Sequence, residues 1–265
     1  MPQGSGPVSG PPRDLQPNAT VTVDVVLFTV RRDEPTERGW QVLLVEPKDS
    51  AFQGRWSLPG ARVHDEETFD AAARRALEHK AGFDAGAWYL EQVGTFGAPH
   101  RDTRGRVISV AHMALVSSHG LDPVPGGGIM RASWVPVRGL PPESLAFDHA
   151  DIVRVAVNRV QSKLRYTWLA FQLLPETFTL PELRAVYAAI LDPALLRLNT
   201  GNFKKAFKAL FASGVLEPVG IRSTGGRVGR PGDLYRFNGP VLGTWARELP
   251  WHRDEGAVIA ALVGR

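Results

Sequence analysis

Cysteine is absent from this chain of 265 residues. Disulfide bonds and thiolate metal sites are therefore excluded, and the composition suits a reducing cytoplasm. No apolar run approaches the roughly 18 residues that a membrane-spanning helix needs. Residues 1–17, rich in proline and glycine, contain no apolar segment typical of a signal peptide. We expect a cytoplasmic protein that does not contact membranes, with a disordered tail at residues 1–17.

Charge is distributed unevenly along the chain. Residues 18–155 carry a net charge of −3, whereas residues 156–265 carry +7. The basic second half favours a polyanionic partner such as nucleic acid, although a basic domain that is merely soluble would show the same balance.

The first half of the chain combines strand signals with one clear helix. Helix-forming residues over 68–80 end at Gly82, a typical helix C-cap. Gly126 to Gly128 predict a turn. Apolar, β-branched runs predict strands at 21–28, 40–45, 89–96, 107–117 and 132–135. Strands before and after a central helix predict an α+β sandwich over residues 18–150.

The segment that begins at Trp56-Ser57-Leu58-Pro59-Gly60-Ala61 resembles the Nudix box, a loop–helix–loop that holds a pyrophosphate through Mg²⁺. With Gly82 on the last glycine of the box, Glu67 and Arg75 occupy the positions of its first glutamate and its arginine. The three glutamates that follow in the box are replaced by Ala76, His79 and Lys80.

The replaced positions share one helix face because they are spaced i, i+3 and i+4. Three carboxylates there would provide the oxygen ligands that Mg²⁺ requires. Alanine offers no ligand, histidine suits softer metals, and a lysine ammonium repels a cation. We therefore expect no metal site and no catalytic residue. Two alternatives stay open: an ordinary amphipathic helix after a Pro-Gly turn, or an active enzyme whose ligands come from Glu66, Glu67 or Glu78.

The second half follows the order of a winged helix-turn-helix. A connecting helix over 151–165 leads into it, and a capping box at Thr179 and Glu182 begins one of its helices. The expected elements of the domain at 166–249 are helices at 168–174, 179–191 and about 199–214, then a hairpin of strands 215–222 and 234–237. Residues 250–265 form a C-terminal tail.

The third helix and the hairpin loop carry the groups expected to contact DNA. Helices of this kind enter the major groove, and flexible basic loops suit phosphate or minor-groove contacts. Asn202 could equally cap its helix, and the loop could be a solvated surface segment. The candidates are Asn202, Lys204, Lys205 and Lys208 on the helix, and Arg222, Arg227 and Arg230 on the wing.

Several motifs in the same order resemble the NrtR family of Nudix-related transcriptional regulators. Beyond the altered box they are residues 90–96, 101–107, 145–149, 163–166, 178–180, 202–205 and 229–231. The resemblance implies a Nudix α/β/α sandwich followed by a winged helix-turn-helix. It further implies a repressor of NAD metabolism that binds a double-stranded DNA operator as a homodimer and senses ADP-ribose, with no cofactor.

The same resemblance places the ligand between the Pro59–Gly60 turn and the 101–106 loop. Asp102 is expected to order its own loop. The two phosphates of ADP-ribose could pair with arginine, and its adenine could stack on an aromatic ring, although each ring could simply belong to the core. The candidates are Arg55, Trp56, Gly60, Arg62, Phe96, Arg104 and Arg106.

Three functions remain in competition at this point. The first is a ligand-responsive repressor of NAD biosynthesis or salvage genes with an inactive Nudix domain. The second is an active Nudix pyrophosphohydrolase of ADP-ribose, and the third is a regulator of sugar metabolism with a sugar-phosphate effector.

Overall fold

The computed structural model describes residues 19–33, 37–48, 54–86, 88–117, 121–164, 167–191, 211, 214–223 and 232–238. The predicted tails at 1–17 and 250–265 lie outside these residues, as does the predicted third helix except for Phe211 and Gly214.

The first half of the chain forms a mixed sheet in the order β4-β5-β1-β2-β6, with the short β3 paired to β1. β1 and β5 are parallel, and the other pairs are antiparallel. Each predicted strand is confirmed, and β1, β2 and β6 are longer than predicted. The strands are β1 (Thr20–Asp33), β2 (Glu37–Pro47), β3 (Gly60–Arg62), β4 (Tyr89–Phe96), β5 (Val107–Leu115) and β6 (Ile129–Pro136).

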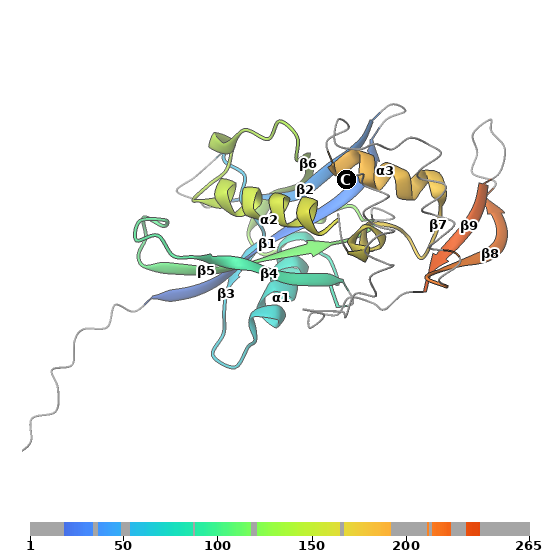
Figure 1. Cartoon of the computed structure of the whole chain (residues 1–265). Helices are drawn as coiled ribbons and strands as arrows, with labels where there is room; N and C mark the ends of the chain where they lie inside the picture. Colours follow the sequence, from blue (N-terminus) through green and yellow to red (C-terminus); the bar gives the residue numbers. More distant parts are fainter. Residues whose placement is uncertain are drawn as a thin grey trace, which may run out of the picture.

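Helices α1 (Phe69–Ala81) and α2 (His149–Lys163) cover opposite faces of this sheet (Figure 1). Alternation along β1 explains the two faces. Val23, Val25 and Leu27 join the core under α1, while Val26 and Phe28 join the core under α2. A short 3₁₀ helix, η1 (Pro142–Ser144), precedes α2.

The predicted C-cap of α1 at Gly82 is confirmed, and the structure adds a cap at the other end of the helix. The Thr68 side chain accepts a hydrogen bond from the backbone N–H of Ala71, and Gly82 ends the helix in the left-handed conformation, with φ +73°. Glycine adopts this conformation without the steric cost that a side chain would bring.

At one end of the sheet, β1 and β2 separate and residues 56–62 enter between them. The β1–β2 pairing ends at Phe28 and Val42. Beyond that point Ser57 pairs with Val45 of β2, and Gly60 pairs with Asp24 of β1. The segment that precedes the box helix is therefore part of the sheet.

The second half contains η2 (Trp168–Leu173), β7 (Thr177–Thr179), α3 (Leu180–Ile190), β8 (Leu216–Ser223) and β9 (Gly232–Phe237). The predicted hairpin is confirmed as β8 and β9, and the unpredicted β7 adds a third strand. The predicted helix at 168–174 is a 3₁₀ helix. The capping box is confirmed, since a Glu182 carboxylate oxygen accepts from the backbone N–H of Thr179 at 2.7 Å.

The two halves share one hydrophobic core. Ile152 and Val160 of α2 belong to the same cluster of buried residues as Leu183 and Tyr187 of α3. Gln161 Nε2 also donates to the carbonyl oxygen of Ile190 at 3.1 Å. In the described part of the chain, no helix combines the length and apolar character needed to cross a membrane.

Candidate ligand-binding site

Two members of the Nudix box form an ion pair that braces the loop before α1. Arg75 Nε donates to Glu67 Oε1 at 2.7 Å, and Arg75 Nη2 donates to Glu67 Oε2 and to the Arg62 carbonyl oxygen, also at 2.7 Å. The hydrogen bond from Arg75 lowers the pKa of Glu67 from 4.5 to about 2. Protein groups alone thus hold this loop on the helix.

The three positions that hold glutamates in the Nudix box provide no oxygen cage. Ala76 is completely buried in the core under α1, and Lys80 Nζ donates to the carbonyl oxygen of Gly127 at 2.6 Å. The His79 side chain is exposed. Within the described residues, no group of three or more His, Asp or Glu side chains could hold a metal ion. The residues present do not fit the Mg²⁺ that the Nudix box implies.

The Pro59–Gly60 turn lies directly against β1. The backbone N–H of Val25 donates to the Pro59 carbonyl oxygen at 2.9 Å. A Cβ added at Gly60 would lie 2.4 Å from Asp24 Oδ1 and 2.8 Å from the Val23 carbonyl oxygen. This close approach requires glycine, which explains why the turn carries one.

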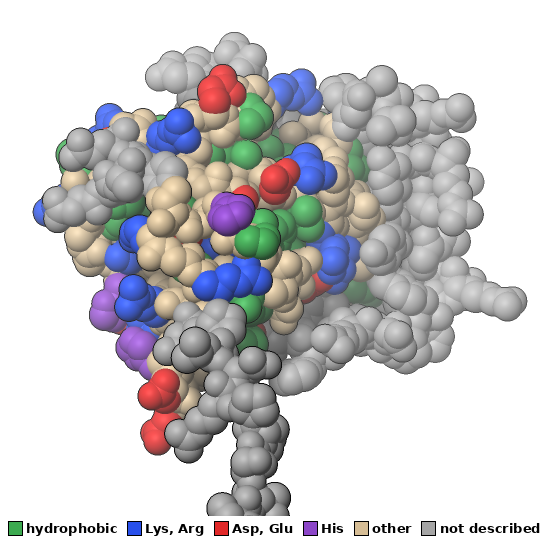
Figure 2. Space-filling model, turned by 90° about the vertical axis from the view of Figure 1, so that its left-hand side faces the viewer, with side chains coloured by type: hydrophobic (Ala, Val, Ile, Leu, Met, Phe, Trp, Pro, Cys, Tyr) green, Lys and Arg blue, Asp and Glu red, His purple; other side chains and the backbone are tan. Residues whose placement is uncertain are grey.

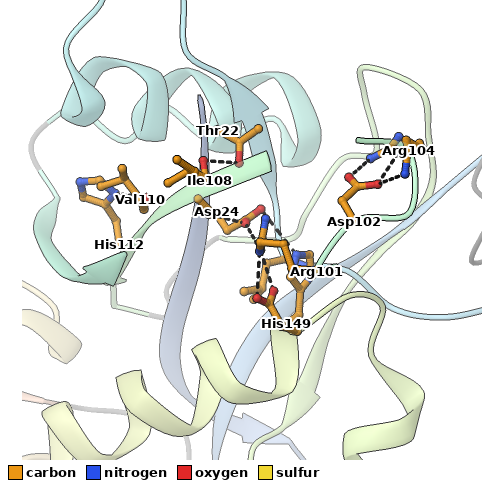
Figure 3. A network of polar contacts seen from close by, with 12 residues as sticks. Thr22, Asp24, Arg101, Asp102, Arg104, Ile108, Val110, His112 and His149 are labelled. Atoms are coloured by element: carbon orange, nitrogen blue, oxygen red, sulfur yellow. Dashed lines mark hydrogen bonds and ion pairs between the residues drawn. The ribbon is translucent and has the colours of Figure 1, made fainter. Parts of the chain in front are cut away.

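Next to this turn lies a network of buried charges (Figure 3). Arg101 Nε and Nη2 donate to the two carboxylate oxygens of Asp148 at 2.8 and 2.6 Å, and Nη2 lies 3.4 Å from Asp24 Oδ2. Ser109 Oγ donates to Asp24 Oδ2 at 2.6 Å. Burial of Arg101 opposes its charge, but the hydrogen bonds and charges of Asp148 and Asp24 outweigh this and raise its pKa. The guanidinium therefore stays charged and paired.

His149, the first residue of α2, connects this network to the turn. Its Nδ1 accepts a hydrogen bond from the backbone N–H of Leu58 at 3.0 Å, and its Nε2 lies 3.6 Å from Asp24 Oδ1. Because an accepting nitrogen carries no proton, the neutral ring holds its proton on Nε2, toward Asp24. Burial lowers the pKa of His149, although the charge of Asp24 opposes this. The ring is neutral at pH 7.

The loop between β4 and β5 is ordered by its own side chains. Asp102 Oδ1 accepts from the backbone N–H of Arg104 at 3.0 Å, and the Arg104 guanidinium donates to both Asp102 oxygens at 3.0 and 2.7 Å. The prediction for Asp102 is confirmed. Arg104 also lies over the Phe147 ring, 5.5 Å from its centroid, and Arg106 Nη1 donates to the Gly97 carbonyl oxygen at 2.6 Å. Two of the four arginines predicted to meet phosphate, Arg104 and Arg106, thus have contacts within the protein.

The remaining predicted ligand residues differ in their surroundings. Trp56 and Phe96 are partly buried against the core under α2, and Arg55 and Arg62 are exposed. Arg131, which the sequence did not single out, lies over the indole of Trp56 at 5.1 Å from its centroid.

The strand order brings the buried charge network, the β4–β5 loop and the predicted ligand residues to one end of the sheet, on the left in Figure 1. The parallel strands β1 and β5 both begin there, and the antiparallel β2 and β4 end there. Figure 2 faces this end: Lys and Arg side chains are spread around a central area where hydrophobic and His side chains reach the surface. Predicted and unpredicted site residues therefore share one region.

Sequence reasoning missed Asp24, Glu46, Arg131, Phe147 and His149 as individual site residues. Asp24 carries a readable signal, because it is the one charge in the apolar run Val-Thr-Val-Asp-Val-Val-Leu-Phe. Glu46 and Arg131 are 85 residues apart and meet only through strand pairing, so no local signal marks them.

In the second half, Arg222 lies in β8 opposite Asp233 of β9. The other predicted DNA-contact residues lie outside the described residues: Asn202, Lys204, Lys205, Lys208, Arg227 and Arg230.

Comparison with known proteins gives matches along most of the chain. Residues 20–156 match the NUDIX domain, and residues 170–237 match the NrtR DNA-binding winged helix domain. A relative from Acinetobacter baylyi, named ADPR responsive transcriptional repressor NtrR, is 34% identical over 224 residues, which cover 83% of each chain. An ADP-ribose pyrophosphatase from Methanocaldococcus jannaschii is 31% identical over 118 residues, 44% of this chain and 66% of that protein.

The solved structures agree with this assignment. The crystal structure of Shewanella oneidensis NrtR complexed with a 27mer DNA has a TM-score of 0.66 and 30% identity, over 82% of this chain and 93% of that one. The predicted fold, a Nudix sandwich followed by a winged helix, is confirmed. Since both domains match in this order and the relatives extend over most of the chain, the protein belongs to the NrtR family of Nudix-related transcriptional regulators.

Proposed function

We propose that this protein is a DNA-binding repressor of NAD biosynthesis or salvage genes, and that its Nudix domain senses ADP-ribose or a related nucleotide without hydrolysing it. One observation carries the proposal. The scaffold of the Nudix box persists through the Glu67–Arg75 pair, while Ala76, His79 and Lys80 provide no carboxylate for Mg²⁺. A winged-helix domain follows this scaffold, and the Acinetobacter baylyi relative is named an ADPR responsive repressor.

The position of α2 supports communication between the two halves. Its first residues, Asp148 as the N-cap and His149, contact the buried network of the site. Near its other end, Arg159 Nη1 and Lys163 Nζ donate to the Glu91 carboxylate of β4 at 2.8 and 2.6 Å. The helix then leads into η2 and α3. A ligand that binds better to the protein conformation free of DNA must weaken DNA binding by the same factor.

For the DNA-binding half we propose residues 166–249, with residues 151–165 as the connecting helix. The proposed contacts are those of the predicted third helix and wing. A second copy of the chain would supply the second recognition helix, because proteins of this class read two half-sites about one DNA turn apart. Such a homodimer would act in the cytoplasm.

The first test is a fluorescence-anisotropy titration of the full chain onto DNA from its own upstream region, at about 0.15 M salt. We expect tight binding that ADP-ribose shifts. The variant Lys204→Ala/Lys205→Ala/Lys208→Ala is expected to lose DNA binding while keeping the affinity for ADP-ribose. Binding no tighter than to unrelated DNA would contradict the repressor. A shift by sugar phosphates alone would favour the regulator of sugar metabolism.

A second candidate is hydrolysis of ADP-ribose, which the similarity to the Methanocaldococcus jannaschii pyrophosphatase favours. The side chains at positions 76, 79 and 80 argue against it. We expect no hydrolysis above background with Mg²⁺ or Mn²⁺. Turnover of ~1 s⁻¹ or more, an ordinary enzyme rate, would establish the enzyme instead.

A further inference from the structure

A charged pair that the sequence did not reveal lies beside Trp56. Glu46 at the end of β2 and Arg131 near the start of β6 are direct partners in the sheet. Arg131 Nε lies 2.6 Å and Nη2 2.5 Å from the same oxygen, Glu46 Oε2. The Glu46 side chain is 7% exposed and that of Arg131 is 62% exposed. A buried carboxylate therefore fixes one edge of a guanidinium whose remainder faces solvent.

The Arg131 guanidinium lies over the indole of Trp56, and backbone hydrogen bonds fix Trp56 in its place. Arg131 Cζ is 5.1 Å from the centroid of the Trp56 indole, a cation–π contact. The backbone N–H of Trp56 donates to Ser144 at 2.9 Å, and its carbonyl oxygen accepts from Ala146 at 2.8 Å. Both members of the stack are thus held before any ligand arrives, which reduces the entropy lost on binding.

The Glu46–Arg131 ion pair determines which part of a nucleotide can bind beside Trp56. Because Glu46 lies within hydrogen-bond distance, its negative charge largely cancels that of Arg131 for any third group. A pyrophosphate would gain little attraction from Arg131 and would be repelled by Glu46. A neutral planar base meets neither penalty, and a guanidinium offers a flat surface for stacking.

We propose that Glu46, Arg131 and Trp56 form the subsite for the base of the nucleotide effector. The proposal rests on the proposed function and deepens it, because it separates the group that reads the base from the groups that meet the phosphates. In this arrangement Arg131 contacts the base, and Glu46 acts as a positioning residue that holds Arg131 on Trp56.

The test uses Arg131→Lys, which keeps a cation for Glu46 but removes the planar group. Isothermal titration calorimetry of the full chain would compare ADP-ribose with ribose 5-diphosphate, which has the same diphosphate and no base. We expect the variant to bind ADP-ribose about tenfold more weakly, the size of one such stacking contact. Affinity for ribose 5-diphosphate should stay the same.

Two further variants separate a specific role from a structural one. Arg154→Lys changes an exposed arginine on α2 that pairs with Asp151, and it should alter neither affinity. Glu46→Gln frees the charge of Arg131, so the preference for ADP-ribose over ribose 5-diphosphate should narrow. Equal losses for both ligands in Arg131→Lys, or no loss for either, would overturn the subsite alone. If the wild-type protein binds neither ligand, the proposed function fails and the subsite with it.

Discussion

The two faces of the central sheet differ in where they bury charge. Under α1, the positions nearest the sheet are small or apolar, with Ala72, Ala76 and Leu77 completely buried. Under α2, Asp24 and Glu46 occupy the inward-facing rows that also contribute Val26 and Leu44 to the core. The Nudix box would place its glutamates on the α1 side. That side has become an ordinary apolar core.

This difference bears on the proposed function. Burying a charge costs several kcal/mol unless it is well paired, so a buried charge that persists calls for a reason. Here the buried charges gather around the Pro59–Gly60 turn and the start of α2, where the predicted ligand residues lie. On the α1 face, the box members Glu67 and Arg75 hold a loop in place, and the buried His112 lies beside Asp70. The comparison favours ligand binding over metal-dependent catalysis.

The strongest test of the comparison is to remove the central cation of the α2 face. Arg101→Ala leaves the buried carboxylate of Asp24 and the partly buried carboxylate of Asp148 without their partner. We expect the free energy of unfolding to fall by about 3–5 kcal/mol. Urea denaturation followed by circular dichroism measures this.

Arg154→Ala is the matched control, because it removes an arginine that is also paired with an aspartate, but both side chains of that pair are exposed, Arg154 at 65% and Asp151 at 63%. The free energy of unfolding of this control variant should fall by less than about 1 kcal/mol. Similar losses in the two variants would mean that the buried network is not what distinguishes this face.

Local signals explain which parts of the fold could be predicted. The C-cap of α1 at Gly82 and the capping box at Thr179 are hydrogen-bonding patterns within a few residues, so the chain itself displays them. The 3₁₀ helix at 168–173 was missed, because an apolar run does not distinguish it from an α-helix. The three-residue β7 is too short to show alternation.

In the candidate site too, only the features with a local signal could be predicted from the sequence. The Pro59–Gly60 turn belongs to a contiguous motif and was predicted. The partners of Arg101 lie 77 and 47 residues away, at Asp24 and Asp148. One sequence without its fold does not show which strands are neighbours, so these pairs could only come from the structure.

A smaller loss of stability is expected when a side chain is added to the Pro59–Gly60 turn on the α2 side of the sheet. In Gly60→Ala, the new methyl group would meet the Asp24 carboxylate and the Val23 carbonyl oxygen closer than atoms normally approach. Overpacking of this kind costs about 1–3 kcal/mol of stability. It should also weaken ADP-ribose binding, measured by calorimetry, because the turn must shift.

Gly39→Ala is a suitable control. A Cβ there would come no closer than 3.7 Å to another side chain, which is an ordinary contact. It should leave stability and binding almost unchanged. If both alanine variants behave alike, the close approach at Gly60 is not a constraint.

The smallest expected change is in the pH dependence of stability, and it involves one buried histidine on each face of the sheet. His149 belongs to the α2 side, and His112 of β5 lies on the α1 side, with its Nε2 3.4 Å from Asp70 Oδ1 of α1. Burial lowers the pKa of both below the ordinary 6.5, and in His112 the charge of Asp70 works against the shift. In the unfolded chain both rings take up a proton as pH falls through about 6.5, whereas in the folded protein both stay neutral to lower pH.

The unfolded state therefore binds more protons just below pH 6.5, and stability must decrease as pH falls from there toward the lowered folded-state pKa values. The slope is at most about 1.4 kcal/mol per pH unit for each histidine. His149→Asn, whose amide oxygen can still accept from the Leu58 N–H, should flatten the pH dependence measured by urea denaturation between pH 7 and 5. His112→Asn should flatten it too, because burial also lowers the pKa of His112. Equal slopes in the wild type and His149→Asn would show that protonation of the α2 network does not limit stability, and the contrast between the two faces would then rest on Arg101 alone.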